Sequence, residues 1–214
     1  MKRITLLITA SIFTLASIAQ IRAVTEKGDT ILVFENGTWK KLNETKTIKE
    51  IETTVKATVE VDAFDNTKKI RTESWFRFGE NKLGNTISGY LFRVDDLTVF
   101  NISYTGDLGC LSEYSSTMKV KLDNGKVIEF SQISDTDCGD NPSARFIPLT
   151  REQMKNEDYK SILKENLEML KNYNWVTIRI NGSEYYTDII PKITKKVTKP
   201  EQFFIQHLIA ADNK

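Results

Sequence analysis

Apolar and polar residues alternate most regularly between residues 54 and 63. The apolar positions are Val55, Ala57, Val59, Val61 and Ala63, and a polar residue stands between each pair. A two-residue period is typical of a strand that buries one face and exposes the other, as strands of antiparallel sheets do. Two more strands are predicted over residues 70–78 and 91–104, on either side of the turn-rich segment 79–84.

Three pairs of strand-like segments flank turns that contain a glycine. They are residues 30–34 and 38–42, 118–122 and 126–130, and 175–180 and 183–188. The first and third turns hold Asn-Gly, which accepts the positive φ angles that a tight hairpin turn requires. The sequence therefore predicts three β-hairpins.

A helical period occurs only in the last third of the chain. Thr150 and Gln153 have the spacing of a capping box, which favours a helix start. Apolar residues then recur at helical spacing, and Pro200 precedes a second apolar segment that closes the chain. These residues are Tyr159, Ile162, Leu163, Leu167 and Leu170, and then Phe203, Phe204, Leu208 and Ile209.

Strand patterns thus dominate residues 28–133, and helices follow them. The expected fold is of the α+β class. It is a mainly antiparallel β-sandwich or partly open barrel with C-terminal helices packed on one side.

The first residues predict export. Lys2 and Arg3 precede an apolar run over residues 4–18, and Ser17-Ile18-Ala19 has the small-x-small pattern of a signal-peptidase site. The apolar run is shorter than the ~20 residues that span a bilayer, although a single membrane anchor is the alternative interpretation. The expected organisation is a signal peptide (1–19), a hairpin segment with a linker (20–46) and a β-rich domain with C-terminal helices (47–214).

Charge gives little indication of a partner. Without residues 1–19 the formal net charge changes from +1 to −1, because only Lys2 and Arg3 are lost. A near-neutral chain with interspersed signs offers no electrostatic case for nucleic acid or anionic lipid. We expect no nucleic-acid partner and no stable membrane insertion once the leader is removed. The basic run Lys192, Lys195, Lys196 and Lys199 is interpreted as a solvated connector.

Cys110 and Cys138 are the two cysteines of the sequence and enclose the second hairpin. Exported proteins meet an oxidising compartment, so an even cysteine count favours one disulfide. The bond would close a loop of about 29 residues and stabilise the fold by roughly 3.6 kcal/mol. Two free buried thiols are the alternative. A structural zinc site is not indicated, because it needs four ligands and the chain has a single histidine.

Two N-terminal motifs carry a resemblance to known proteins. Ser17-Ile-Ala-Gln20 is followed by Gly28-Asp-Thr30 and by Phe34-Glu-Asn-Gly-Thr-Trp39. In these segments the chain resembles small, β-rich exported proteins of Bacteroidota-type bacteria that have no characterised function. The resemblance implies an exported β-rich protein, and it implies no activity and no site.

A polar loop follows the second hairpin. Asp135, Asp137 and Asp140 lie near Gly139 and Asn141, and such hard oxygen ligands are those that Ca²⁺ prefers. The spacing is not that of a calcium-binding hand, because Phe146 stands where its twelfth-position glutamate would be. A calcium site at the three aspartates is one interpretation, and a turn held by the disulfide is the other. No further cofactor is expected.

Trp75, Phe76 and Phe78 form the densest aromatic cluster. They could make a platform on which a sugar ring stacks, with Arg77 as a polar guide. Aromatic residues in strands otherwise pack in the core or across strands. Both interpretations stay open from the sequence.

Familiar catalytic patterns are missing from the sequence. His207 is the one imidazole, and it is interpreted as a surface or packing residue rather than a base. No Gly-x-Ser-x-Gly elbow or zinc-protease helix is present. Carboxylates that meet in the fold could still hydrolyse a glycoside, and Glu113 with Asp135 or Asp137 would be the candidates.

The sequence therefore favours a secreted or periplasmic, non-catalytic binding or assembly module. Its ligand and its partner proteins are unknown at this stage. A β-barrel that carries a small apolar ligand is the first alternative, because a curled sheet can enclose a cavity. A carboxylate-based hydrolase is the second.

Overall fold

The computed structural model describes residues 21–24, 30–33, 39–41 and 53–214. The chain divides into two compact units, residues 1–49 and 50–214. The predicted signal peptide and the linker lie outside the described residues, so both stay predictions. In the described part of the chain, no helix is long and apolar enough to cross a membrane.

The first unit contains three antiparallel strands, β1 (Ile21–Val24), β2 (Thr30–Val33) and β3 (Trp39–Lys41). Val33 pairs with Trp39 and Ile31 with Lys41, which confirms the first predicted hairpin. Its Asn-Gly turn lies outside the described residues.

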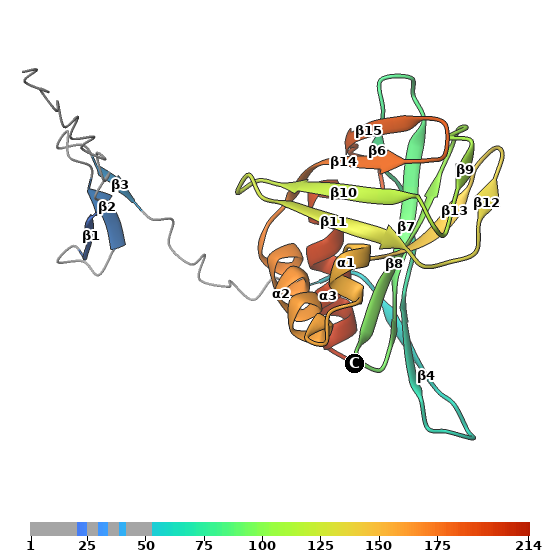
Figure 1. Cartoon of the computed structure of the whole chain (residues 1–214), viewed down its shortest axis with the longest axis horizontal. Helices are drawn as coiled ribbons and strands as arrows, with labels where there is room; N and C mark the ends of the chain where they lie inside the picture. Colours follow the sequence, from blue (N-terminus) through green and yellow to red (C-terminus); the bar gives the residue numbers. More distant parts are fainter. Residues whose placement is uncertain (1–20, 25–29, 34–38, 42–52) are drawn as a thin grey trace, which may run out of the picture. The chain divides into compact units, whose positions relative to one another are not determined.

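The second unit contains all the other elements (Figure 1). Its strands are β4 (Ala57–Val61), β5 (Lys68–Thr72), β6 (Trp75–Glu80), β7 (Thr86–Val94), β8 (Leu97–Tyr104), β9 (Cys110–Leu111), β10 (Thr117–Leu122), β11 (Val127–Gln132), β12 (Asp137–Cys138), β13 (Ser143–Ile147), β14 (Trp175–Asn181) and β15 (Tyr186–Pro191). Its helices are α1 (Arg151–Met154), α2 (Tyr159–Asn172), the 3-10 turn η1 (Pro200–Gln202) and α3 (Phe203–Asp212).

Most of these strands form a sheet that closes on itself. The pairings run β7-β6-β15-β14-β10-β11-β13-β8, and β8 returns to β7, with every pair antiparallel. The seams β6–β15 and β11–β13 hold only two residue pairs each. The barrel is therefore partly open, and the predicted α+β class with a mainly antiparallel sheet is confirmed.

Two of the predicted long strands are each divided. The chain leaves β5 after Thr72 and enters β6 at Trp75, so the two short strands pair with different halves of β7 along one edge. The predicted strand over residues 91–104 turns back between Val94 and Leu97, where Asp95 adopts a φ of 47°. Asp tolerates this left-handed conformation, so it can make a tight turn without glycine.

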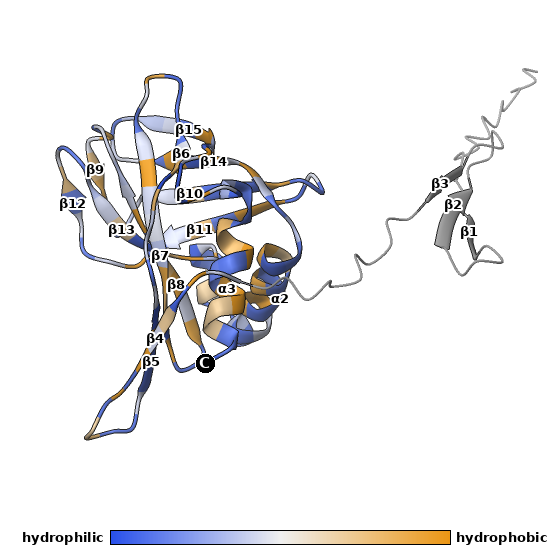
Figure 2. Ribbon diagram, turned by 180° about the vertical axis from the view of Figure 1, so that it is seen from behind, coloured by the Kyte–Doolittle hydropathy of each residue, from blue (hydrophilic) through white to orange (hydrophobic). Residues whose placement is uncertain are grey.

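The alternating segment forms β4, but its predicted apolar face is buried only at its start, where Val55 is 6% exposed and Ala57 is half-buried against the core. Residues 58–61 are all exposed, with Val59 at 41% and Val61 at 58% of their full accessibility. β4 pairs with β5, and together they form an arm that extends away from the barrel and the helices (Figure 1). Apolar segments lie along this arm in Figure 2. The alternation identified a strand correctly, and it did not show whether anything covers it.

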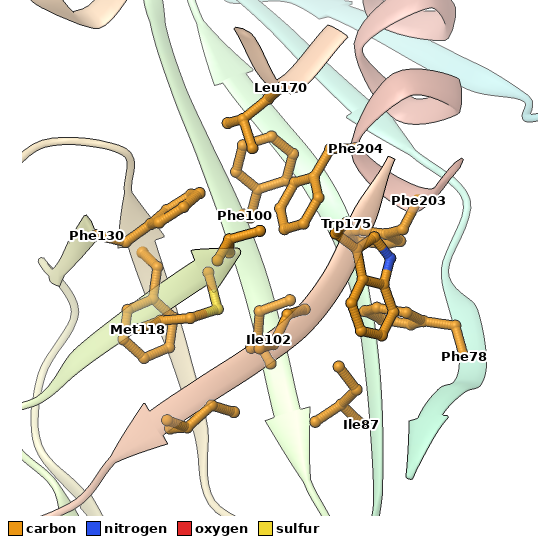
Figure 3. Close-up of a cluster of buried hydrophobic side chains, with 14 of the residues drawn as sticks. Phe78, Ile87, Phe100, Ile102, Met118, Phe130, Leu170, Trp175, Phe203 and Phe204 are labelled. Carbon is orange, nitrogen blue, oxygen red and sulfur yellow. The ribbon is translucent and has the colours of Figure 1, made fainter. Parts of the chain in front are cut away.

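Helix α3 fills the core of the barrel from one end. Phe203 and Phe204 project from it among the side chains of the surrounding strands (Figure 3). Phe203 stacks on Phe78 with ring centroids 4.1 Å apart, and Phe204 lies edge-on to Phe100. Eight of the ten residues of α3 are buried, so the predicted single apolar face is in fact a helix that is buried on nearly all sides. α2 packs on α3, which places the helices on one side as expected.

The predicted disulfide is confirmed. Cys110 and Cys138 face each other across the two-stranded β9–β12 ribbon and are bonded. The second predicted hairpin, β10–β11, lies inside the closed loop, and Met118 pairs with Phe130 there. Gln132 ties the ribbon to the body, because its buried Nε2 donates to the carbonyl of Leu111 at 2.9 Å.

Replacing both cysteines by alanine is expected to lower the free energy of unfolding by about 2–4 kcal/mol, because the unfolded chain regains the entropy of a loop of about 29 residues. Urea unfolding of the oxidised chain and of the double variant measures the difference. The oxidised chain treated with a reductant should match the double variant. Equal stabilities of the oxidised chain and the double variant would contradict a stabilising bond.

Candidate functional site

A groove of about 890 Å³ lies beside β6 in the second unit. One wall is the connection from β5 into β6, residues 73–77, and the other is the segment 194–199 that follows β15. Gln202 and Gln206, from η1 and α3, and Thr54, just before β4, complete it. Four parts of the chain thus meet at one open site.

A β-bulge shapes the first wall. The register between β6 and β7 shifts between Trp75 and Gly79, and Arg77 adopts a φ of 54°. The other described non-glycine residues with positive φ are asparagine or aspartate, which tolerate it, so Arg77 is the one strained position. The Arg77 amide donates to Ser88 Oγ at 3.0 Å, which fixes the bulge. Bulges of this kind re-aim side chains and occur next to functional sites.

The bulge separates the three aromatic residues that the sequence grouped. Phe78 is fully buried and stacks on Phe203, so it belongs to the core and not to a binding platform. Trp75 is half-buried, and its ring lies edge-on to those of Phe203 and His207. Phe76 is 66% exposed. The aromatic surface of the groove is therefore Trp75 and Phe76, because a bulge breaks the strand alternation before Phe78.

Positive charge gathers on the groove. Arg77, Lys195, Lys196 and Lys199 line it, and among the described residues Glu73 is the one carboxylate that does so. The whole chain carries a formal net charge of only +1, so this concentration is local. The run of lysines is therefore not only a solvated connector, since three of its members face a shaped surface next to aromatic rings.

Gln206 lines the floor of the groove and is 8% exposed. Its side-chain amide donates to Gln202 Oε1 at 3.3 Å, so the two glutamines are joined. Its Oε1 is buried and has no hydrogen-bond partner among the described residues, although buried polar atoms are normally paired.

His207 lies behind Trp75 and is completely buried, so the surface interpretation of this residue is wrong and the packing interpretation holds. Its Nδ1 lies 2.6 Å from Thr72 Oγ1, which in turn accepts from the Leu91 amide and lies 3.3 Å from the Leu91 carbonyl. All these groups are satisfied when Nδ1 carries the proton, which leaves Nε2 without a partner in the described structure. Burial lowers the pKa of His207 to about 3.

The three aspartates of the loop are not gathered into a cluster of side chains that could share a metal ion. No group of three His, Cys, Asp or Glu side chains that could hold a metal ion occurs among the described residues, which include Asp135, Asp137 and Asp140. Oxygen atoms of the loop already accept protein hydrogen bonds: Asp137 from the Ser143 amide, and the carbonyls of Ser134 and Asp135 from Gln132. Both Gly139 and Asn141 have positive φ angles, so the segment forms a turn beside the disulfide.

The hydrolase candidates come from the same region. The Glu113 amide donates to Thr136 Oγ1 at 3.3 Å, so the two loops do meet. Glu113 is half-buried, whereas Asp135 and Asp137 are exposed. None of the three carboxylates is buried, so the structure does not show the desolvated acid that a hydrolytic pair needs.

Several residues of the groove could not be identified from the sequence. Thr54, Gln202 and Gln206 belong to segments far apart in the chain, and no short motif joins them. The one signal in the sequence was the run of lysines after Pro191. This run lies beside β6, because the Lys192 amide donates to the carbonyl of Phe78 at 3.0 Å.

No family model, no curated protein and no solved structure matches the chain.

Acid should destabilise the fold through His207. Its pKa is about 3 in the folded chain and near 6.5 when unfolded, so the unfolded state takes up the proton first as the pH falls. The stabilising contribution is complete well above pH 6.5 and declines toward pH 3. Between pH 8 and pH 5 the loss should be about 2 kcal/mol. Urea unfolding across this range measures it, and His207→Leu should lose that much less. An equal decline in both proteins would contradict the assignment.

Relief of strain at Arg77 should stabilise the chain. Glycine adopts a φ near +54° without the steric cost of Cβ, so Arg77→Gly should raise the free energy of unfolding by about 0.5–1 kcal/mol. Arg77→Ala keeps the strain and serves as the matched control, and urea unfolding of both variants gives the comparison. A glycine variant no more stable than the alanine variant would show that Arg77 is not strained.

Proposed function

We propose that the chain is an exported, non-catalytic module that binds a short saccharide bearing acidic groups in the groove beside β6. The observation that carries this proposal is the pairing of Trp75 and Phe76 with a cluster of cationic side chains on one hollow surface.

The aromatic residues suit the apolar face of a sugar ring. Phe76 is mostly exposed, and Trp75 offers the part of its ring that Phe203 and His207 do not cover. A rigid aromatic residue contributes a large contact area at little cost in conformational entropy. Trp75 is held in place by its neighbours in the core, so little freedom is lost when a ligand stacks on it.

The cationic residues suit carboxylate or sulfate groups of the ligand. Arg77 can bind a carboxylate through two parallel N–H donors, and Lys195, Lys196 and Lys199 act as point charges around it. The hydroxyls and amides of the groove, from Thr54, Ser74 and the two glutamines, match sugar hydroxyls. A neutral saccharide would contact these hydroxyl and amide groups without using the cationic ones.

The rest of the proposal follows from the core and the disulfide. The barrel interior is filled by the large side chains of the core cluster, and this packing speaks against an apolar ligand carried inside it. The disulfide between Cys110 and Cys138 is expected of a protein that works in an oxidising compartment, secreted or periplasmic.

Calorimetric titration with oligogalacturonate, an acidic saccharide, should give saturable binding that weakens as salt is added, because charge contributes to it. Maltohexaose, a neutral saccharide, should bind at least tenfold more weakly. Phe76→Ala and Arg77→Gly should each weaken oligogalacturonate binding by about tenfold, which corresponds to the loss of about 1.4 kcal/mol.

Tyr114→Ala is the matched control, since Tyr114 is a 78% exposed aromatic residue that does not line the groove. It should leave the affinity unchanged. Binding that is equally weakened by all three substitutions, or that is indifferent to the two in the groove, would place the saccharide elsewhere.

A further inference from the structure

The arm formed by β4 and β5 ends the sheet with an open edge. β4 pairs with β5 and has no second neighbour among the strands that the structure describes. Such an edge presents a row of backbone donors and acceptors to any strand that can pair with it. Proteins usually protect an open sheet edge. The residues along an unprotected edge therefore indicate which kind of strand can pair with it.

The backbone groups that face the open edge belong to the apolar residues of β4. The carbonyl of Lys56 accepts from the Glu73 amide at 2.8 Å, and the Asp62 amide donates to the Thr67 carbonyl at 3.0 Å, so even-numbered residues bond toward β5. Neighbouring residues alternate in an antiparallel ladder. The N–H and C=O groups of Ala57, Val59 and Val61 therefore point to the open edge.

The side chains of β4 match those of a second β4 strand that runs in the opposite direction. In an antiparallel pairing centred on Val59, each residue lies opposite the one at the mirrored position. Ala57 then faces Val61, and Val59 faces its own counterpart. Thr58 faces Glu60, and Lys56 faces Asp62. Apolar residues thus meet apolar ones, opposite charges meet, and no like charges lie directly opposite each other.

We infer that the open edge of β4 pairs with β4 of a second copy of this chain, in antiparallel register about Val59. The three edge residues of each copy supply matched donors and acceptors, and the contact is symmetric, as two-fold dimer interfaces are. The exposure of Val59 and Val61, at 41% and 58%, is then explained, because the second copy covers them.

The expected dimer is reversible. Two short strands bury less than the roughly 1,200–2,000 Å² of stable interfaces, so association should depend on concentration. This inference is independent of the saccharide site, because the groove is lined by Thr54 and by residues outside β4.

Sedimentation velocity of the purified full chain over a wide concentration series tests the inference, with the monomer-dimer equilibrium as the readout. Val59→Pro removes an N–H that β5 does not use, so it should weaken dimerisation at least tenfold while the melting temperature of the monomer shifts by only a few degrees. Val59→Thr keeps the N–H and the β-branched shape, and it should still dimerise.

Cysteine crosslinking tests the register. Val59→Cys places two thiols opposite each other and should form a dimer under mild oxidation, whereas Val61→Cys faces Ala57 and should crosslink several-fold more slowly. A chain that is monomeric at every concentration would overturn the inference. So would unchanged dimerisation of the proline variant, equal crosslinking at both positions, or a different polypeptide bound to β4 of a monomeric chain.

Discussion

The stacking of Phe203 on Phe78, at 4.1 Å between ring centroids, is one of the contacts through which the second unit packs around α3. It seats α3 in the barrel, and a helix that is buried on nearly all sides is stable only if each neighbour offers it a matching surface. Its neighbours are fixed in return. Thr53 Oγ1 donates to the carbonyl of Gln206 at 3.0 Å, and the Trp175 indole donates to the carbonyl of Pro200 at 2.7 Å. The start of the arm and the β14 strand are therefore anchored to the same helical segment.

The groove owes its shape to this helix and to the bulge in β6. The helix supplies Gln206 and supports Trp75 from behind, η1 supplies Gln202, and the bulge turns Phe76 and Arg77 outward. Neither element would form the groove alone. A strained backbone residue kept beside a rigid aromatic ring is the kind of arrangement in which some stability is given up for a fixed binding geometry.

Local patterns in the sequence were enough for the parts of the fold that form locally. Hairpins β2–β3 and β10–β11 follow from the alternating segments that were predicted to pair, and the Thr150–Gln153 capping box is present as predicted. The third hairpin forms with a different turn: Asn181 pairs with Tyr186, so residues 182–185 make the turn instead of Asn181-Gly182. Whether a strand or a side chain is covered depends on contacts between distant parts of the chain. The periodicity of the sequence therefore could not predict that most of β4 is exposed or that His207 is buried. The bulge in β6 could not be predicted from the sequence, because Arg77 rather than a glycine adopts its left-handed backbone conformation. The groove combines segments more than a hundred residues apart, such as Thr54 and Gln206.

The bond between Cys110 and Cys138 also determines what a protease can do to this chain. Strands β10 and β11 and the Asp123–Gly125 turn between them all lie inside the closed loop. A single cut at that exposed turn would break the backbone, yet both fragments would stay covalently joined and their strands would stay paired with β14 and β13. The backbone would then be cut without separating the two parts of the chain.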